Sequence, residues 1–453
     1  MDKKSSYLLK NTSILTICNF SSKILVFLLV PLYTSVLTTA EYGIYEIIMS
    51  TIQLLVPFLT LNVSEGVLRF LMDKDANVEQ VKGIGLIFVS ASIICFVTII
   101  LVNNYFDLLD TLTLYNLETI LYYVAYVFNQ LFIQTAKGEE RVKDLGVAGV
   151  ISTFVSLLMN VLLLVIIPFG LKGFFYAYIL GQASSAFYLM RRVHFFGHIS
   201  FSIRKDLLAD LLKYSLPLIF VTLGWLINNV SDRYVVTWLC GLEQNGIYSV
   251  SYKIPTIITT VQNIFIQAWT ISAIKEYENK ERNQFYQNIF FKFNGLIVGC
   301  CSFLIITTKA FAKFLYSNDF YVAWQYVPFL LVSVVFGAAS GFIGPILSAE
   351  KNSKALASST FLGAIVNLVL NYILISVIGV QGAAVATLLS NIVIYVLRRL
   401  SIGNILIDRN YKKIIFSWIL VSIQAVFMVL DYTIIIQLPV MILLLIVYWK
   451  IIK

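Results

Sequence analysis

Long apolar blocks, separated by short polar segments, run along almost the whole chain. Each block has about 17 to 25 residues, the length that an α-helix needs to cross about 30 Å of hydrocarbon. The blocks lack the strict alternation of apolar and polar positions that a membrane β-barrel requires. We therefore predict an all-α integral membrane protein with about fourteen transmembrane helices. The predicted helices span residues 11–37, 43–66, 83–103, 116–136, 146–168, 172–190, 213–239, 245–272, 290–308, 324–348, 355–378, 380–397, 413–430 and 433–450.

The composition agrees with this prediction. Of the 453 residues, 59% are hydrophobic and 13% are charged, and the mean hydropathy is +0.85. A soluble domain with this balance would have too little polar surface to cover its core. The first apolar block continues to about Leu37 without a small-residue cleavage site, so we interpret it as a retained helix. No cysteine spacing resembles a metal site, and we predict none.

The distribution of lysine and arginine predicts the topology. Cytoplasmic loops collect these residues, and 27 of the 33 fall on the inner side when the N-terminus is placed in the cytoplasm. The predicted outer loops hold only Lys172, Lys309 and Lys313. We therefore expect both termini to be cytoplasmic. This topology also explains the net charge of +9, so we predict contacts with membrane lipids and no nucleic-acid partner.

Two short motifs recur at nearly the same offset. Gly-Ile-Tyr occurs at 43–45 and again at 246–248, and Gly-x-x-Gly occurs at 170–173 and again at 379–382. The offsets of 203 and 209 residues indicate a repeat of about six helices. Because six is even, both copies start from the same side of the membrane as parallel, pseudo-symmetric lobes.

The repeat predicts four segments along the chain. The N-terminal lobe with helices 1–6 covers 1–190, and a cytoplasmic linker covers 191–212. The C-terminal lobe with helices 7–12 covers 213–400, and helices 13 and 14 in 401–453 are an appendage.

The segment "YSLPLIFVTLGWLINNVSDRYVVTWLCGLEQNGIYSVSYKIP" combines several unusual features. They are a proline early in a predicted helix (Pro217), an Asp-Arg pair late in it (Asp232 and Arg233), a Gly-x-x-x-x-Gly-Ile-Tyr turn (241–248) and a lysine (Lys253). The segment resembles the signature region of polysaccharide-export flippases, which belong to the multidrug, oligosaccharidyl-lipid and polysaccharide exporter superfamily. The stretches "LTTAEYGIYEI" and "SAEKNSKALASSTFLGAIVNLVLNYILI" are also similar to that family, so the resemblance covers most of the chain.

The resemblance implies a transporter, not an enzyme. Such proteins move an undecaprenyl-pyrophosphate-linked oligosaccharide from the cytoplasmic to the outer leaflet by alternating access, for O-antigen or capsule biosynthesis. It also implies a multi-pass protein of the cytoplasmic (inner) membrane, monomeric, that works beside the polymerase and chain-length proteins of the pathway.

Five of the charged residues inside predicted helices are candidates for function. Charges at such depth usually face a bundle interior or a watery cavity, because they are costly in hydrocarbon. The three cations, Lys23, Arg233 and Lys253, are candidates for holding the pyrophosphate, which suits cations in a low dielectric and the fork of an arginine. Glu46 and Asp232 are candidates for counter-charges or for coupling to protons or Na⁺. The alternative is that these charges form static ties between helices.

Further polar residues allow two interpretations each. Helix-helix hydrogen bonds or contacts with sugar hydroxyls would explain the polar residues of helices 7 and 8, which are Asn228, Asn229, Gln262, Asn263 and Gln267. Glu65 and Arg69 are four residues apart near the cytoplasmic end of helix 2. We predict an i,i+4 ion pair there, and the alternative is a contact with the incoming substrate.

Two rival functions belong to other classes. No nucleotide-binding Gly-x-x-x-x-Gly-Lys loop is present, so we expect no cofactor. Transport is then either coupled to a proton or sodium gradient or runs downhill. A polymerase or ligase of the same pathway would be expected to carry a large catalytic outer loop, whereas the longest ones here, 103–115 and 309–323, are short and hold no histidine. A multidrug exporter of the same superfamily would be expected to favour an acidic cavity, unlike these three cations.

Overall fold

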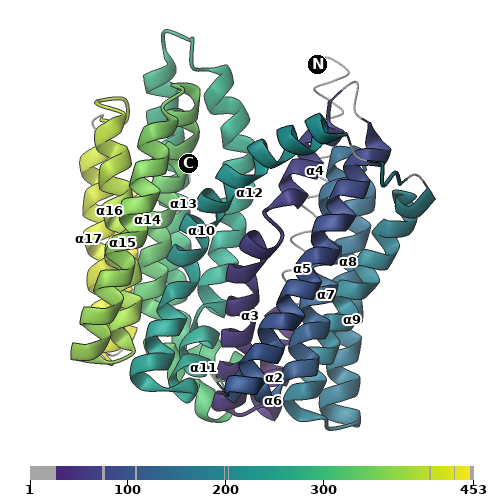
Figure 1. The fold of residues 1–453 in the computed structure, drawn as a ribbon. Helices are drawn as coiled ribbons and strands as arrows, with labels where there is room; N and C mark the ends of the chain where they lie inside the picture. The colour runs from purple at the N-terminus through teal and green to yellow at the C-terminus, as the bar shows by residue number, and fades with distance from the viewer. Residues whose placement is uncertain are drawn as a thin grey trace. The chain divides into compact units, whose positions relative to one another are not determined.

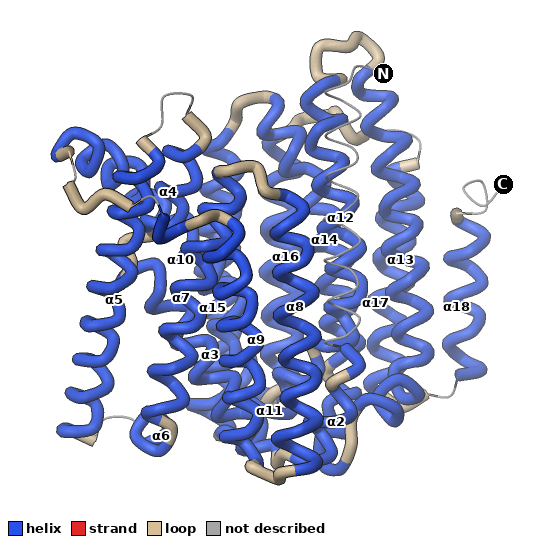
Figure 2. The backbone as a smooth tube through the Cα atoms, turned by 90° about the vertical axis from the view of Figure 1, so that its right-hand side faces the viewer, coloured by secondary structure: helices blue, strands red, loops and turns tan. Residues whose placement is uncertain are grey.

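The described part of the chain is helical. The computed structural model describes residues 27–73, 77–107, 110–197, 199–202, 204–407, 410–432 and 434–448. Among these residues there is no strand, as Figure 2 shows. Ten of the described helices are long and apolar enough to cross a membrane. The predicted all-α membrane architecture is thus confirmed, while the count of fourteen helices and the cytoplasmic position of both termini stay predictions.

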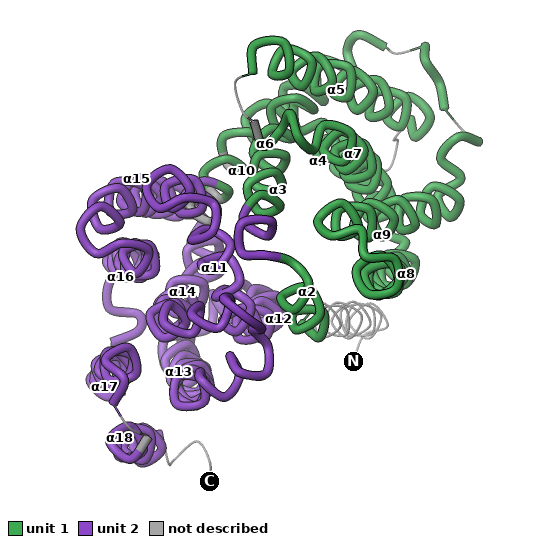
Figure 3. The backbone as a smooth tube through the Cα atoms, turned by 90° about the horizontal axis from the view of Figure 1, so that it is seen from below, with its two compact units in different colours: residues 1–37, 44–226 green, residues 38–43, 227–453 purple. Residues whose placement is uncertain are grey.

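The chain divides into two compact units (Figures 1 and 3). Unit 1 comprises residues 1–37 and 44–226, and unit 2 comprises residues 38–43 and 227–453. Helices α3 (Thr39–Leu59) and α10 (Lys205–Cys240) each contribute residues to both units. The predicted linker 191–212 therefore ends inside a helix, because α10 begins at Lys205 rather than at residue 213.

Unit 1 is built around helix α7 (Asn116–Gly138), which packs against α4 (Val63–Leu71), α5 (Val78–Phe106) and α9 (Gly170–Arg192). Helix α9 also packs along α8, and the chain leaves α8 through one π-helical turn, η1. The remaining elements of the unit are α2 (Val30–Val36), α6 (Asp110–Leu114), α8 (Val142–Asn160), η1 (Val161–Ile166) and η2 (Phe195–Gly197).

A buried ion pair ties three segments of unit 1 together. Lys82, in the second turn of α5, is 2% exposed, although the sequence places it in a cytoplasmic loop. Its Nζ donates to the carbonyl oxygen of Val193 at 2.9 Å and lies 2.7 Å from Oε1 of Glu139. The ends of α7 and α9 close over this turn, which explains the burial of the ammonium group.

We expect Lys82→Met to destabilise the protein by about 1–3 kcal/mol, because it removes a buried donor from the carbonyl of Val193. Glu139 keeps Arg141, whose Nε donates to it at 2.8 Å. Thermal unfolding of the purified protein checks the expected loss of stability. The exposed pair Lys309–Asp431 provides the control, since Lys309→Met should lower the melting temperature little. An unchanged melting temperature for Lys82→Met would contradict the expectation.

Unit 2 is organised around α14 (Val327–Ala349), whose side chains are buried almost throughout. The helix is apolar on all sides and carries a run of small residues, "GAASG" at 337–341, which lets neighbouring helices approach closely. It packs against α12, α13, α16 and α17. The other elements are α11 (Leu242–Ser251), α12 (Lys253–Lys275), α13 (Arg282–Leu315), η3 (Asn318–Gln325), α15 (Ser353–Ile378), α16 (Gln381–Ser401), α17 (Tyr411–Val429) and α18 (Ile434–Val447).

The glycines of the two Gly-Ile-Tyr motifs face each other within unit 2. A Cβ atom built on Gly43 would lie 2.0 Å from the carbonyl oxygen of Leu242. A Cβ atom built on Gly246 would lie 1.9 Å from the carbonyl oxygen of Thr39. Asn245 adds a hydrogen bond from its Nδ2 to the carbonyl of Gly43 at 3.1 Å. Equivalent positions of the repeat therefore make equivalent backbone contacts.

Two predicted helices are broken in the structure. Predicted helix 2 (43–66) is interrupted after α3 at residues 60–62, and α4 continues the chain. Predicted helix 8 (245–272) is divided at Tyr252 into α11 and α12. Of predicted helix 1 (11–37), the described helical part is Val30–Val36.

Candidate functional site

Asp232 is the most deeply buried charged group that the sequence singles out in unit 2. It lies in α10, is 2% exposed, and accepts hydrogen bonds at Oδ2 from the hydroxyls of Tyr248 at 2.8 Å and Tyr252 at 2.6 Å. The two hydroxyls also lie 3.0 Å apart, and the backbone N–H of Arg233 donates to Oδ1 at 3.0 Å. Hydrogen bonds to a carboxylate are strong, so this network fixes where α11 packs on α10.

The two cations of unit 2 lie directly beside this network. Arg233 follows Asp232 in α10 and is half-buried. Lys253 follows Tyr252 as the first residue of α12, and its Nζ lies 5.7 Å from the ring centroid of Tyr42. Because Asp232 and Tyr252 are hydrogen-bonded to each other, the backbones of the two cationic residues are held near one another. The third candidate cation, Lys23, lies outside the described residues, so convergence of all three stays a prediction.

Glu46 lies in unit 1, buried at 7% exposure in α3. The ring of the neighbouring Tyr45 packs edge-on against Phe174, with the centroids 4.6 Å apart, and its centroid lies 5.6 Å from that of Tyr178. The carboxylate of Glu46 is close enough to Tyr178 to interact with it electrostatically. Its predicted pairing with a cation remains a prediction, because Lys23 is outside the described part.

Three of the candidate sugar contacts are on α12. Gln262 is half-buried, and Asn263 and Gln267 are exposed. None of the three forms a hydrogen bond with another described residue, so they do not act as ties between helices within the described part of the chain. Asn228 and Asn229 belong to α10, but their side chains lie outside the description.

The predicted ion pair between Glu65 and Arg69 is wrong. Arg69 pairs instead with the exposed Asp73, one turn further along. Glu65 accepts a hydrogen bond from Nε2 of Gln134 on α7. The physical reason is that α4 packs against α7, which turns Glu65 into the unit while Arg69 stays on the exposed face.

Sequence reasoning missed a second polar cluster beside Asp232. Ser231 donates to Oδ1 of Asn367 at 2.9 Å, and the same oxygen accepts from Nδ2 of Asn371 at 3.0 Å. Asn367 in turn donates to Ser390 at 3.4 Å. All four side chains are buried and link α10, α15 and α16. The spacing of Asn367 and Asn371, one helical turn apart in an apolar block, was an available signal.

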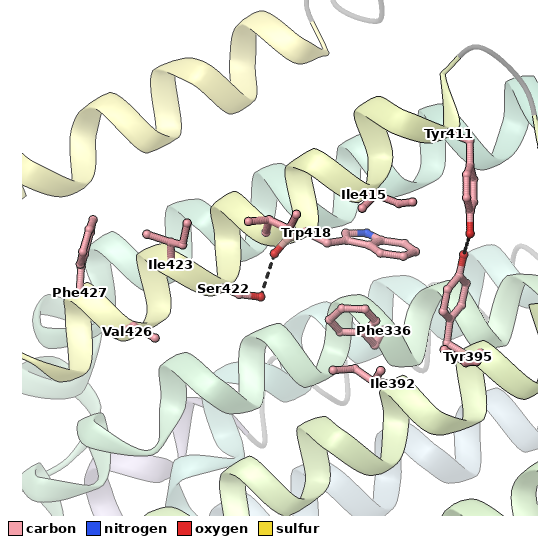
Figure 4. Close-up of a pocket in the computed structure, with 12 residues that line it drawn as sticks. Phe336, Ile392, Tyr395, Tyr411, Ile415, Trp418, Ser422, Ile423, Val426 and Phe427 are labelled. Atoms are coloured by element: carbon pink, nitrogen blue, oxygen red, sulfur yellow. Dashed lines mark hydrogen bonds between the residues drawn. The ribbon is translucent and has the colours of Figure 1, made fainter.

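A cavity in unit 2 is apolar. It has a volume of about 640 Å³ and lies between α14, α16 and α17 (Figure 4). Phe336, Trp418 and Ile419 line it, and the hydroxyls of Tyr395 and Tyr411 meet at 2.9 Å at one end. With no charged group in its lining, this cavity suits hydrocarbon and cannot serve a pyrophosphate.

The chain belongs to a family of polysaccharide biosynthesis proteins. The family profile described as "Polysaccharide biosynthesis protein" matches residues 8–271, which is more than half of the chain. The resemblance noted from the sequence is thereby confirmed. A comparison with curated protein sequences found no significant match.

Solved structures show the same fold. A structure described as "Lipid II flippase MurJ, inward closed conformation" has a TM-score of 0.72 at 15% identity, covering 97% of this chain and 99% of that one. An inward-facing multidrug resistance MATE family transporter of the MOP superfamily has a TM-score of 0.68 at 15% identity, covering 86% and 95%. A MOP superfamily transporter from Pyrococcus furiosus has a TM-score of 0.61 at 14% identity, covering 88% and 97%. The chain therefore has the fold of these multi-pass membrane transporters.

Proposed function

We propose that this protein is a flippase that moves an undecaprenyl-pyrophosphate-linked oligosaccharide repeat unit across the cytoplasmic membrane. The observation that supports the proposal is the buried Asp232 network, which hydrogen-bonds Asp232 to Tyr252, the residues that precede Arg233 and Lys253 in the chain. Buried cations within membrane helices are costly unless they serve a partner or a ligand. A doubly charged pyrophosphate is such a ligand, and the family and fold support a lipid-linked substrate.

The proposed cycle alternates access to this site from the two sides of the membrane. Arg233 offers a fork of N–H donors to the phosphate oxygens, and Lys253 adds a second, flexible charge. Asp232 balances these cations when no substrate is bound, and it or Glu46 takes up a proton or Na⁺ in the return step. The sugars stay in the watery part of the site while the lipid tail remains in the bilayer.

The proposal includes the biological setting that the sequence predicts. The protein would act as a monomer in the inner membrane, beside the polymerase and chain-length proteins that use the exported repeat units. Its product would be an O-antigen or a capsule.

The deciding experiment follows lipid-linked repeat units in cells that lack the protein. Leaflet-selective labelling should show that intact units accumulate on the cytoplasmic face and that the native chain relieves the accumulation. Normal delivery to the outer face, with only the polymer length changed, would contradict the proposal and favour the polymerase or ligase. Normal delivery together with a raised sensitivity to cationic drugs would favour the multidrug exporter.

A further inference from the structure

A cavity of about 330 Å³ with a partly polar lining lies within unit 1. We call it the amide cavity, after the four amide side chains in its lining, which are Gln53, Asn62, Gln130 and Gln134. Its polar lining includes Gln53, Asn62, Glu65, Tyr126, Gln130 and Gln134. These residues come from α3, α4 with its preceding turn, and α7, and α10 closes one side through Thr222 and Leu226. Among the described residues, the lining contains no lysine or arginine.

The break between α3 and α4 contributes directly to this cavity. Leu61 and Asn62 have φ values of 49° and 53°, in the left-handed region that β-carbon-bearing residues seldom occupy. Irregular backbone at membrane depth is tolerated where it lines a protein-enclosed or water-filled cavity. Asn62, in this turn, directs its Nδ2 to Oγ1 of Thr222 at 3.3 Å. The strained turn thus places polar groups where an uninterrupted apolar helix would have none.

Gln134 presents a buried carbonyl oxygen that accepts no hydrogen bond from the described residues. Its side chain is 6% exposed, and its Nε2 donates to the carboxylate of Glu65. Because an ionised carboxylate only accepts, this bond fixes the amide with Nε2 toward Glu65. The carbonyl Oε1 then has no hydrogen-bond partner among the described residues. A buried acceptor without a donor costs about 1–3 kcal/mol, which a ligand hydroxyl would recover.

The lining selects the chemistry of the ligand. The described lining supplies no cation to balance a pyrophosphate, and its amide N–H and hydroxyl donors offer more than a bare metal ion would use. Its volume is at the lower end of small-molecule sites. Tyr126 and Pro57 add apolar surface beside the polar groups. Hydroxyl groups that both donate and accept, carried on a compact ring with apolar C–H faces, match this combination.

We propose that the amide cavity binds neutral sugar residues of the lipid-linked oligosaccharide, with Oε1 of Gln134 accepting a hydrogen bond from a sugar hydroxyl. The inference rests on the proposed function, since it assigns a sugar-binding subsite to the same substrate. Two sites then recognise the substrate. The charged site in unit 2 binds the pyrophosphate, and the amide cavity in unit 1 binds the glycan. The choice of sugar is then a property of α3, α4 and α7.

The test measures the binding of two lipids to the full chain in nanodiscs. One lipid is bare undecaprenyl pyrophosphate, and the other is the same lipid carrying the repeat unit extracted from the cells. Gln134→Leu should weaken binding of the glycan-bearing lipid about tenfold, the effect of losing one buried hydrogen bond, and leave the bare lipid unchanged. Gln53→Leu should act in the same direction and breaks no hydrogen bond between described residues, so it serves if Gln134→Leu folds poorly.

The matched control is Gln287→Leu, a half-buried glutamine in unit 2 that donates to the carbonyl of Ile405 at 2.8 Å. It should leave the binding of both lipids unchanged. If the native chain binds neither lipid, the proposed function itself fails. If the native chain binds both and the two cavity variants bind the glycan-bearing lipid as the native chain does, the inference is overturned while the function stands. Equal weakening of both lipids, with a changed dependence on Na⁺, would also overturn it and assign the cavity to an ion.

Discussion

Arg233→Ala should reduce transport of the lipid-linked repeat unit about a hundredfold while the protein reaches the membrane in normal amount. The guanidinium can form two charge-assisted hydrogen bonds to phosphate oxygens, each stabilising the complex by about 1.5–3 kcal/mol. Their joint loss corresponds to a factor of about a hundred or more. Lys253→Ala should have a smaller effect of the same sign, because an ammonium group offers a single point of charge.

Two control variants sharpen this prediction. Arg233→Lys keeps the charge without the fork, so transport should fall between the native level and that of Arg233→Ala. Lys309→Ala removes a cation that pairs with Asp431 and lies 4.4 Å from the ring centroid of Trp324. Transport by this variant should equal that of the native chain. The measurement is the rate at which the glycan becomes accessible on the outer leaflet of proteoliposomes, and native transport by Arg233→Ala would exclude the residue from the site.

Gly43→Ala and Gly246→Ala should each destabilise the protein by more than about 3 kcal/mol, the cost of severe overpacking. The added methyl group would sit 2.0 Å or 1.9 Å from a backbone oxygen, far inside ordinary van der Waals contact. A backbone oxygen cannot rotate away as a side chain can, so α3 and α11 must move apart. Helix α11 would then lose the position in which Tyr248 and Tyr252 reach Asp232.

Gly299→Ala is the matched control for these glycines. Gly299 lies in α13, and a Cβ atom there meets nothing within 4 Å. Alanine should stabilise that helix by about 0.5–1 kcal/mol, because glycine loses more conformational freedom on folding. In thermal unfolding experiments in detergent, we therefore expect Gly43→Ala to lower the melting temperature and Gly299→Ala to raise it. Equal shifts for the two variants would contradict the close contact.

Much of the fold could be predicted because apolar length alone determines where membrane helices run. The predicted helix 116–136 corresponds to Asn116–Gly138, and 355–378 corresponds to Ser353–Ile378. The start of α10 was missed because Lys205, Asp206 and Asp210 interrupt the apolar run, although the leucine pairs at 207–208 and 211–212 have the spacing of an amphipathic helix. The break at 60–62 was missed because "LTLNVS" has no glycine there, and the left-handed turn depends on packing with α7 and α10.

The charged residues of the candidate site could be predicted from the sequence, but the residues that bind them through hydrogen bonds or ion pairs could not. Asp232, Arg233 and Lys253 stand out because charges are rare in apolar blocks. That Tyr248 and Tyr252 hold Asp232 depends on how α11 packs on α10, although their one-turn spacing was a signal. Arg69 had two acidic residues at four-residue spacing, Glu65 and Asp73, and only the packing of α4 on α7 decides between them.

The contact between the two Gly-Ile-Tyr motifs has a consequence for genetics. Gly43 approaches residue 242 and Gly246 approaches residue 39, and both pairs are related by the same offset of 203 positions. This reciprocity is the pattern of an isologous interface between two identical subunits, here contained in one polypeptide. Because each glycine meets main chain rather than a side chain, trimming a neighbouring residue cannot relieve the clash. Suppressors of Gly43→Ala should therefore map to positions that shift a whole helix, and not to the residues that Gly43 touches.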